Sequence, residues 1–172
     1  PIVSTTTSGF SIAALAAGRS DDFGRAFLGT HFFNPPRYTR LLELIPTAAT
    51  APHVIEALED YAPRSLGKGT VRAKDTPAFI ANRLGVYGLQ RALALAQELG
   101  LGVDEVDELT GPLIGRPKSA TFRTLDVVGL DVAVAVADHC HADLPDDPQR
   151  EVFVVAPILR QLIQRGALGE KA

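Results

Sequence analysis

The pattern of apolar residues changes near residue 75, and this change constrains the fold more than any other feature of the sequence. Before it, short apolar runs typical of strands alternate with segments of helical periodicity. We predict strands at 2–6, 27–33, 41–45 and 69–73, and helices at 11–17 and 51–66, the second capped by Thr50 with Pro52 in its first turn. Several of the apolar runs do not alternate, which indicates strands covered on both faces. Residues 1–74 are therefore predicted to form an α/β domain.

The remaining residues are predicted to be helical throughout. Thr76 is expected to cap a helix with Pro77 at its first position, because apolar residues then recur at helical spacing. Helices are predicted at 79–99, 104–109, 121–140 and 148–165, the last ending at Gly166. We therefore place a domain boundary near residue 75, with an all-α domain over 75–172.

Composition excludes several classes of protein. The chain has 172 residues, of which 46% are hydrophobic, enough for a packed core. Its formal net charge is −3 and its basic residues are scattered, which argues against nucleic-acid binding. The longest helical segment is interrupted by polar residues and fails as a membrane span. A single cysteine and the lack of a signal-peptide pattern indicate a reducing compartment, expected to be the cytoplasm.

The sequence His139-Cys140-His141 suggests a metal site, but we expect none. Residues two apart on a helix point in different directions, and no second Cys or His cluster completes a ligand set. The frayed end of a helix is the simpler interpretation.

His31 and Glu43 are the strongest candidates for chemistry. A lone histidine more often packs in a strand and bonds a backbone carbonyl, and Glu43 alone fits a strand residue that points to solvent. Their neighbours favour another interpretation: Phe32 and Phe33 can exclude water, and Asn34 offers a donor and an acceptor before two prolines fix the turn. Strands adjacent in sequence are usually adjacent in space. The hypothesis is a general base oriented by a carboxylate.

Two further polar residues have two open interpretations each. Ser8 ends a strand just before a helix, where open α/β sheets place ligand contacts, but Ser8 or Ser11 would serve equally as a helix cap. Asn82 lies in an apolar helix start, where asparagine is unfavourable, so it either bonds the backbone locally or reaches a ligand.

No glycine-rich phosphate loop is found in the sequence. The Gly-x-Gly at Gly100 and Gly102 follows a helix rather than a strand, and Glu105 stands where a third glycine would be. The chain also begins without methionine and directly with a predicted strand. We expect it to be a region of a longer protein.

Several sequence blocks together resemble the 3-hydroxyacyl-CoA dehydrogenase family. They occur in the family's order from about Thr5 to Leu130 and resume at residues 168–171. The matching blocks are Gly29-Thr30-His31-Phe32-Phe33-Asn34-Pro35-Pro36, Leu42-Glu43-Leu44-Ile45, Leu66-Gly67-Lys68, Asp75-Thr76-Pro77-Ala78-Phe79-Ile80-Ala81-Asn82-Arg83-Leu84 and Asp126-Val127-Val128-Gly129-Leu130-Asp131. The block at 115–122 resembles long bacterial members, some of which also carry an enoyl-CoA hydratase module.

The resemblance implies that the parent protein oxidises an L-3-hydroxyacyl-CoA to the 3-oxoacyl-CoA with NAD, in fatty-acid β-oxidation. The first part of the chain would then be the remnant of a dinucleotide-binding sheet, and the all-α part would form a homodimer. His31 matches the base that takes the hydroxyl proton, and Glu43 matches its carboxylate partner. Ser8 and Asn82 match residues that contact the reacting oxygen. The matches near NAD are Ser8, Asn34 and Lys171.

Three departures from the family pattern qualify these implications. Ala78 stands where the family usually has glycine, the pyrophosphate loop is missing, and the chain stops before the usual glycine-aromatic tail. We therefore expect these residues alone to bind NAD poorly. Two other functions fit: a non-catalytic dimerisation or acyl-CoA-binding module, and a related dehydrogenase of small hydroxy acids.

Overall fold

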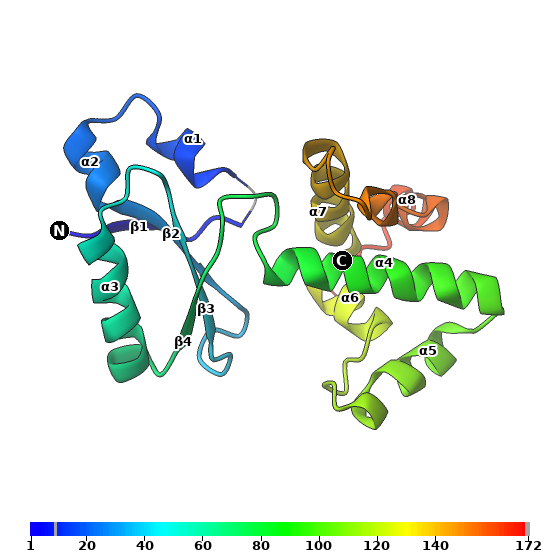
Figure 1. Ribbon diagram of the computed structural model, residues 1–172. Helices are drawn as coiled ribbons and strands as arrows, with labels where there is room; N and C mark the ends of the chain where they lie inside the picture. The colour runs from blue at the N-terminus through cyan, green and yellow to red at the C-terminus, as the bar shows by residue number, and fades with distance from the viewer. Residues whose placement is uncertain (9, 171–172) are drawn as a thin grey trace. The chain divides into compact units, whose positions relative to one another are not determined.

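The chain folds into two compact units, Pro1–Ile80 and Ala81–Ala172 (Figure 1). The computed structural model describes residues 1–8 and 10–170. The first unit is a small mixed sheet with short helices, and the second is built from helices. This is the predicted succession of an α/β part and an all-α part.

The sheet of the first unit has four strands in the order β1-β2-β3-β4. Strand β1 pairs parallel with β2, β2 antiparallel with β3, and β3 parallel with β4. All four predicted strands are found, close to their predicted bounds. They are β1 (Val3–Thr5), β2 (Phe27–Phe32), β3 (Leu41–Pro46) and β4 (Gly69–Arg72).

Both faces of the central strands are buried, as the non-alternating sequence predicted. Leu28, Leu42 and Leu44 pack against helix α3 (Pro52–Tyr61) on one face. On the other face, Ile45 packs with Phe79 and with Ile12 of helix α1 (Ile12–Ala16). Side chains of β3 therefore alternate between two apolar layers, and Glu43 falls on the same face as Ile45.

Two helix starts in this unit differ from prediction. Helix α2 (Asp21–Ala26), which we did not predict, is capped by the Ser20 hydroxyl. Helix α3 starts at Pro52 after Ala51 without a side-chain cap, because the Thr50 hydroxyl donates to the Phe27 carbonyl instead, 2.7 Å away. The chain continues from α3 into a π-helical turn η1 (Ala62–Leu66), which ends at Gly67 with a φ of 63°.

The predicted helix start at Thr76 and Pro77 is wrong. Ala78 and Phe79 have φ angles of 59° and 49°, which a right-handed helix does not allow. Helix α4 (Ala81–Leu99) begins only after them. The carboxylate of Asp75 instead caps α1: it accepts hydrogen bonds from the Ser11 hydroxyl at 2.8 Å and from the Ile12 and Ala13 amides at 2.9 and 2.8 Å.

The second unit packs its helices around an apolar core that includes Leu93, Leu125, Val134 and Leu159. Two predicted helices are divided in the structure. The segment 121–140 breaks at Gly129, whose φ of 98° is unsuited to a helix, and the segment 148–165 contains a 3-10 turn and a helix that begins at Pro157. The elements are α5 (Val103–Thr110), the 3-10 helix η2 (Pro112–Ile114), α6 (Phe122–Val128), α7 (Leu130–Asp143), the 3-10 helix η3 (Arg150–Phe153) and α8 (Pro157–Gln164).

Among residues 1–8 and 10–170, no helix combines the length and the apolar character that a membrane crossing requires.

Candidate functional site

His31 and Glu43 are directly opposite each other in the antiparallel β2–β3 pair. The Nδ1 atom of His31 lies 2.7 Å from Oε2 of Glu43. Glu43 is fully buried and His31 is 6% exposed, so the interpretation of Glu43 as a solvent-facing strand residue is wrong. The predicted contact between the two side chains is confirmed.

The second carboxylate oxygen of Glu43 fixes the pair to the chain that leads into α4. Oε1 accepts a hydrogen bond from the Ile80 amide at 3.1 Å. With both oxygens engaged, the carboxylate holds the imidazole in one orientation. When Nδ1 donates to the carboxylate, a neutral imidazole presents Nε2 as the proton acceptor.

Aromatic rings enclose the imidazole. The ring centroids of Phe33 and Phe79 lie 4.5 and 5.5 Å from that of His31, both in edge-on geometry. Phe33 matches the prediction of a water-excluding neighbour, whereas Phe32 packs on the opposite face with the Leu28 layer. Phe79 was missed, because nothing in the local sequence indicates that the turn before α4 folds back onto β2.

Ser8 and Asn34 follow the carboxyl ends of two parallel strands, β1 and β2. Both residues are exposed, and both lie at the end of the sheet toward which His31 is placed in β2. The question of helix capping is resolved in favour of Ser11, whose hydroxyl accepts from the Ala14 amide at 3.2 Å. Ser8 is thus left at the edge where open α/β sheets bind ligands.

Lys68 is a site-supporting residue that the sequence analysis did not single out. Its side chain is buried, and its ammonium group donates to the backbone carbonyls of Pro36 and Thr39. These bonds tie down the loop between His31 and Glu43. The only sequence signal was its place in the short block Leu66-Gly67-Lys68, which gives no hint of the partner.

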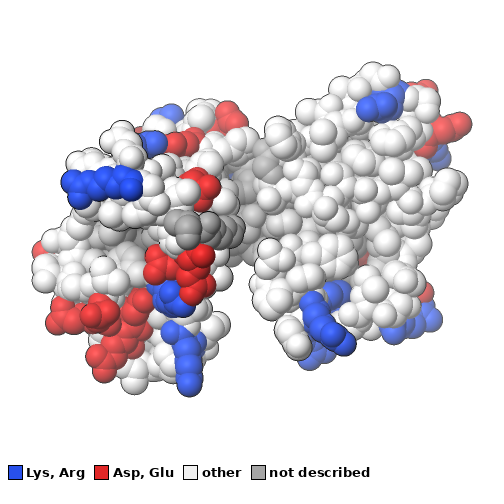
Figure 2. All heavy atoms as spheres, turned by 180° about the vertical axis from the view of Figure 1, so that it is seen from behind, with Lys and Arg blue, Asp and Glu red and all other residues white. Residues whose placement is uncertain are grey.

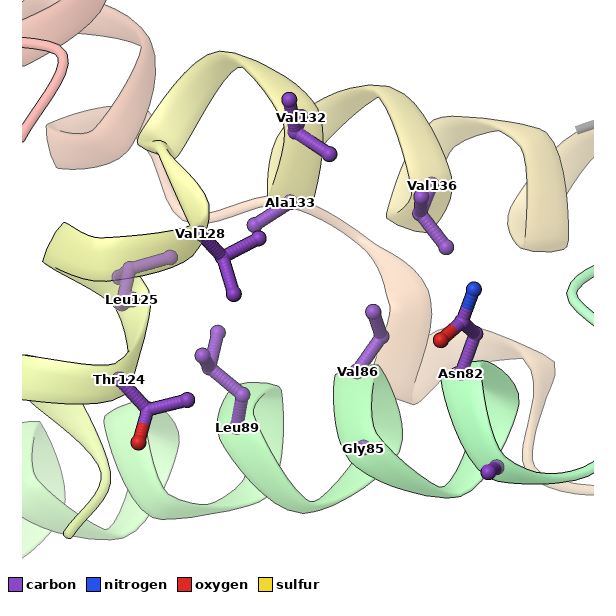
Figure 3. A pocket seen from close by; sticks show the side chains of 11 residues that line it. Asn82, Gly85, Val86, Leu89, Thr124, Leu125, Val128, Val132, Ala133 and Val136 are labelled. Atoms are coloured by element: carbon purple, nitrogen blue, oxygen red, sulfur yellow. The ribbon is translucent and has the colours of Figure 1, made fainter. Parts of the chain in front are cut away.

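Asn82 lies in the second unit, in the first turn of α4. It is half-buried, and its side-chain amide has no hydrogen bond within the described part of the chain, which disfavours the local backbone bond as its role. It lines an open pocket of about 190 Å³ between α4, α6 and α7 (Figure 3). Lys171, the third predicted contact to NAD, lies outside the described residues.

Arg83, the residue after Asn82, is held by an ion pair. The Arg83 guanidinium pairs with the Asp147 carboxylate. The Gln149 amide and Arg83 both donate to that carboxylate and hold its pKa below its usual range. The start of α4 is thereby fixed to the segment between α7 and η3.

The remaining charges are dispersed. Figure 2 shows, on the face it presents, basic and acidic side chains in small separate groups. Near the end of α7, Nδ1 of His139 lies 3.6 Å from Oδ2 of Asp143. Nε2 of His141 lies 3.8 Å from Oε1 of Glu151. Cys140, between the two histidines in sequence, is buried. The residues described include no group of three or more potential metal ligands.

Comparison with known proteins matches both parts of the chain to one family. Residues 1–76 match the family model of the 3-hydroxyacyl-CoA dehydrogenase NAD binding domain, and residues 79–172 match that of the C-terminal domain. A probable 3-hydroxyacyl-CoA dehydrogenase of Bacillus subtilis is 53% identical over 99% of the chain, and one of Deinococcus radiodurans is 47% identical over 99%. The chain spans 22% and 49% of these two relatives.

Solved structures give the same result. The crystal structure of Mycobacterium tuberculosis FadB2 superposes with a TM-score of 0.87 at 29% identity, covering 99% of this chain and 57% of that one. The (S)-3-hydroxybutyryl-CoA dehydrogenase PaaH1 of Ralstonia eutropha superposes with a TM-score of 0.84 at 29% identity, with the same coverage.

Proposed function

Because the chain belongs to the 3-hydroxyacyl-CoA dehydrogenase family, we propose that the complete protein oxidises an L-3-hydroxyacyl-CoA to the 3-oxoacyl-CoA with NAD. The observation that carries this proposal is the buried His31–Glu43 pair, in which a carboxylate orients an imidazole inside an aromatic enclosure. A base held this way fits an alcohol oxidation, in which a hydroxyl proton must be removed.

In the proposed reaction, Nε2 of His31 takes the proton of the 3-hydroxyl as its O–H bond breaks. Glu43 stabilises the imidazolium that forms and keeps the ring aligned. Bound NAD would supply the acceptor for the hydride that leaves C3 as the carbonyl forms. Ser8 and Asn82 are proposed to contact the oxygen, the Asn82 amide as a hydrogen-bond donor to its developing charge.

NAD is proposed to approach the carboxyl ends of β1 and β2. The exposed side chains of Ser8 and Asn34 at that edge offer hydroxyl and amide groups suited to a nicotinamide carboxamide. Lys171 remains a predicted contact to the cofactor. The 172 residues contain no glycine-rich phosphate loop, so these residues would hold only the nicotinamide end.

The helical unit is proposed to form a homodimer. It exposes large apolar side chains on neighbouring elements: Leu95 and Leu99 of α4, Leu109 of α5, and Leu113 and Ile114 of η2. Exposed apolar groups of this kind are typical of an interface. Sedimentation of the complete protein tests this proposal, since Leu99→Glu should shift a dimer toward monomer and Leu84→Glu, an equally exposed leucine of α4, should not.

We further propose that the complete protein acts in fatty-acid β-oxidation and that it is located in the cytoplasm. A relative from Rickettsia felis, 33% identical over 99% of this chain, is named a putative fatty acid oxidation complex trifunctional enzyme, which supports a place in fatty-acid oxidation. The single cysteine, Cys140, is buried and free, which suits a reducing compartment.

The replacement His31→Gln in the complete protein tests the activity. NADH formation from a 3-hydroxyacyl-CoA should fall about a hundredfold or more in kcat, the usual effect of losing a general base. A non-catalytic binding module would have no turnover to lose. An enzyme of small hydroxy acids would reduce NAD with free hydroxy acids and leave the CoA esters unchanged.

A further inference from the structure

We propose that Asp75 is a positioning residue for the reaction, because its carboxylate ties the turn that encloses His31 to the helix that begins shortly after Ser8. The inference rests on the proposed dehydrogenase function and adds to it a residue that acts through its neighbours. One carboxylate would then align both the base and the edge of the sheet where the nicotinamide is proposed to lie.

The carboxylate of Asp75 joins two segments that are 62 to 64 residues apart in sequence. Its Oδ2 atom accepts hydrogen bonds from the Ser11 hydroxyl and the Ala13 amide, both at 2.8 Å. Its Oδ1 atom accepts from the Ile12 amide at 2.9 Å. Hydrogen bonds to a carboxylate are stronger than those between neutral groups. A helix of five residues, as α1 is, is too short to be stable alone, so its place depends on such tertiary bonds.

Helix α1 covers the face of the sheet that carries the catalytic pair. Ile12 is fully buried and packs with Ile45 and Phe79. A Cβ atom at Gly29 would lie 2.9 Å from Cδ1 of Ile12, so the Ile12 side chain rests directly on β2. Gly29 and His31 are two residues apart in this strand and therefore face the same side of the sheet. A movement of α1 would reach the layer that holds the imidazole.

The turn that follows Asp75 is strained and is held at both of its ends. Ala78 and Phe79 have φ angles of 59° and 49°, and a backbone of this kind persists only where its surroundings fix it. Asp75 fixes the first end of the turn to α1. At the other end, the Ile80 amide donates to Oε1 of Glu43 at 3.1 Å. Between these two anchors, the Phe79 ring packs edge-on against the imidazole.

Two effects on catalysis follow from this arrangement. Without the Asp75 carboxylate, the Ile80 amide is less well placed and the Glu43 carboxylate holds the imidazole less firmly. A small misplacement caused by a change outside the reacting groups can lower the rate about a hundredfold. Ser8 stands three residues before Ser11 in the sequence, so the edge proposed for the nicotinamide loosens as well. We therefore expect a lower kcat together with a higher KM for NAD.

A double-mutant cycle between Asp75 and His31 separates positioning from folding. In the complete protein, kcat for NADH formation from a 3-hydroxyacyl-CoA and KM for NAD are measured for Asp75→Ala, with His31 present and in His31→Gln. Asp75→Asn, which keeps one acceptor oxygen, is the milder variant and decides the matter if Asp75→Ala does not fold. Ser20→Ala is the matched control, since it removes the hydroxyl that caps α2 in the same unit.

With His31 present, Asp75→Ala should lower kcat about tenfold or more and raise KM for NAD severalfold. In His31→Gln the same change should lower kcat less than about twofold, because the base that Asp75 helps to align is gone. Asp75→Asn should show smaller losses with the same pattern. Ser20→Ala should lower the thermal midpoint and leave both kinetic constants unchanged. Equal factors in the two backgrounds, or an unchanged kcat, would overturn the inference.

Amide hydrogen exchange adds a measurement that does not depend on turnover. The segment 76–80 should exchange faster in Asp75→Asn than in the wild type or in Ser20→Ala, because the turn has lost one anchor. Unchanged exchange in this segment would contradict the inference even if kcat falls. Absence of NADH formation by the wild type with any 3-hydroxyacyl-CoA would contradict the proposed function instead, and exchange would still decide whether Asp75 fixes the turn.

Discussion

Glu43 is paired with His31 across two antiparallel strands, and its fully buried carboxylate lies 2.7 Å from Nδ1 of the imidazole. A buried charge is tolerated only where partners satisfy it, and here the His31 ring and the Ile80 amide do so. The two residues should therefore behave as one functional unit.

A double-mutant cycle on this pair should be strongly non-additive. Glu43→Gln keeps a hydrogen-bonding side chain but removes the charge that orients and stabilises the imidazolium, so kcat should fall about ten- to a hundredfold. When His31→Gln is already present, adding Glu43→Gln should cost little more. Steady-state NADH formation gives kcat for the wild type, the two single variants and the double variant of the complete protein. If the two losses multiply, the residues act independently and the unit does not exist.

Asn82→Asp should impair turnover without impairing stability. The exchange replaces a donor amide by a carboxylate, which repels charge developing on the substrate oxygen, and kcat should fall about a hundredfold or more. The described residues offer Asn82 no side-chain hydrogen bond to lose, so the thermal midpoint should stay within a degree or two of wild type. Gln97→Glu, on an exposed position of the same helix, is the control. A large drop in the midpoint of Asn82→Asp would indicate a structural role.

Glycine should be tolerated at position 78 but not at position 73. Both alanines are buried, yet Ala78 has a φ of 59°, a left-handed conformation that costs an L residue about 1–2 kcal/mol. In Ala78→Gly, relief of that cost offsets the lost methyl group and the added chain entropy, and the free energy of unfolding should change by less than about 0.5 kcal/mol. In Ala73→Gly nothing offsets the lost methyl group and the added chain entropy, so the free energy of unfolding should fall by about 1–2 kcal/mol. Denaturant unfolding compares the two variants directly.

Removing the ammonium group of Lys68 should release the loop that follows His31. In Lys68→Met the carbonyls of Pro36 and Thr39 lose their buried donor, so the exposed Arg37 and Arg40 become better trypsin sites. Limited proteolysis followed by mass spectrometry should detect faster cleavage there. Lys74→Met alters an exposed lysine of the same unit and should leave the rate unchanged. Equal cleavage rates in both variants would show that Lys68 does not restrain the loop.

Asp147 should make the second unit sensitive to acid. The Gln149 amide and Arg83 lower the pKa of its carboxyl group from the usual 3.8, so the stabilisation is present above that value and is lost as the pH falls through the lowered pKa. Asp147→Asn should have a lower thermal midpoint than wild type at neutral pH. The difference should shrink toward pH 3. A constant difference across that range would assign the stabilisation to hydrogen bonding alone.

The sequence predicted what is local along the chain. The four strands and the meeting of His31 with Glu43 followed from apolar runs and from the tendency of consecutive strands to pair. Contacts from distant segments could not be predicted: the Phe79 ring, the Ile80 amide and the cap that Asp75 provides for α1 depend on the chain returning after β4.

The errors in helix bounds have local causes. Pro77 predicts a helix start, but the positive φ angles of Ala78 and Phe79 postpone α4 to Ala81. Gly129 and Pro157 are helix-breaking residues in the sequence, and the two predicted helices are divided at these positions. Neither the open pocket at Asn82 nor the buried position of Lys68 has any local signature, because both arise only from tertiary packing.

The register of β2 against β3 makes the contact between His31 and Glu43 depend on the length of the 33–40 loop. Neighbouring residues of a strand face opposite sides of the sheet, so a shift by one position would set Leu42 or Leu44 opposite His31 and turn Glu43 toward the wrong layer. Substitutions at the other side chains of this loop, beyond Phe33 and Asn34, should therefore be tolerated in functional descendants of this chain. Insertions or deletions of a single residue should be rare, because one such event would disconnect the histidine from its carboxylate while leaving every side chain intact.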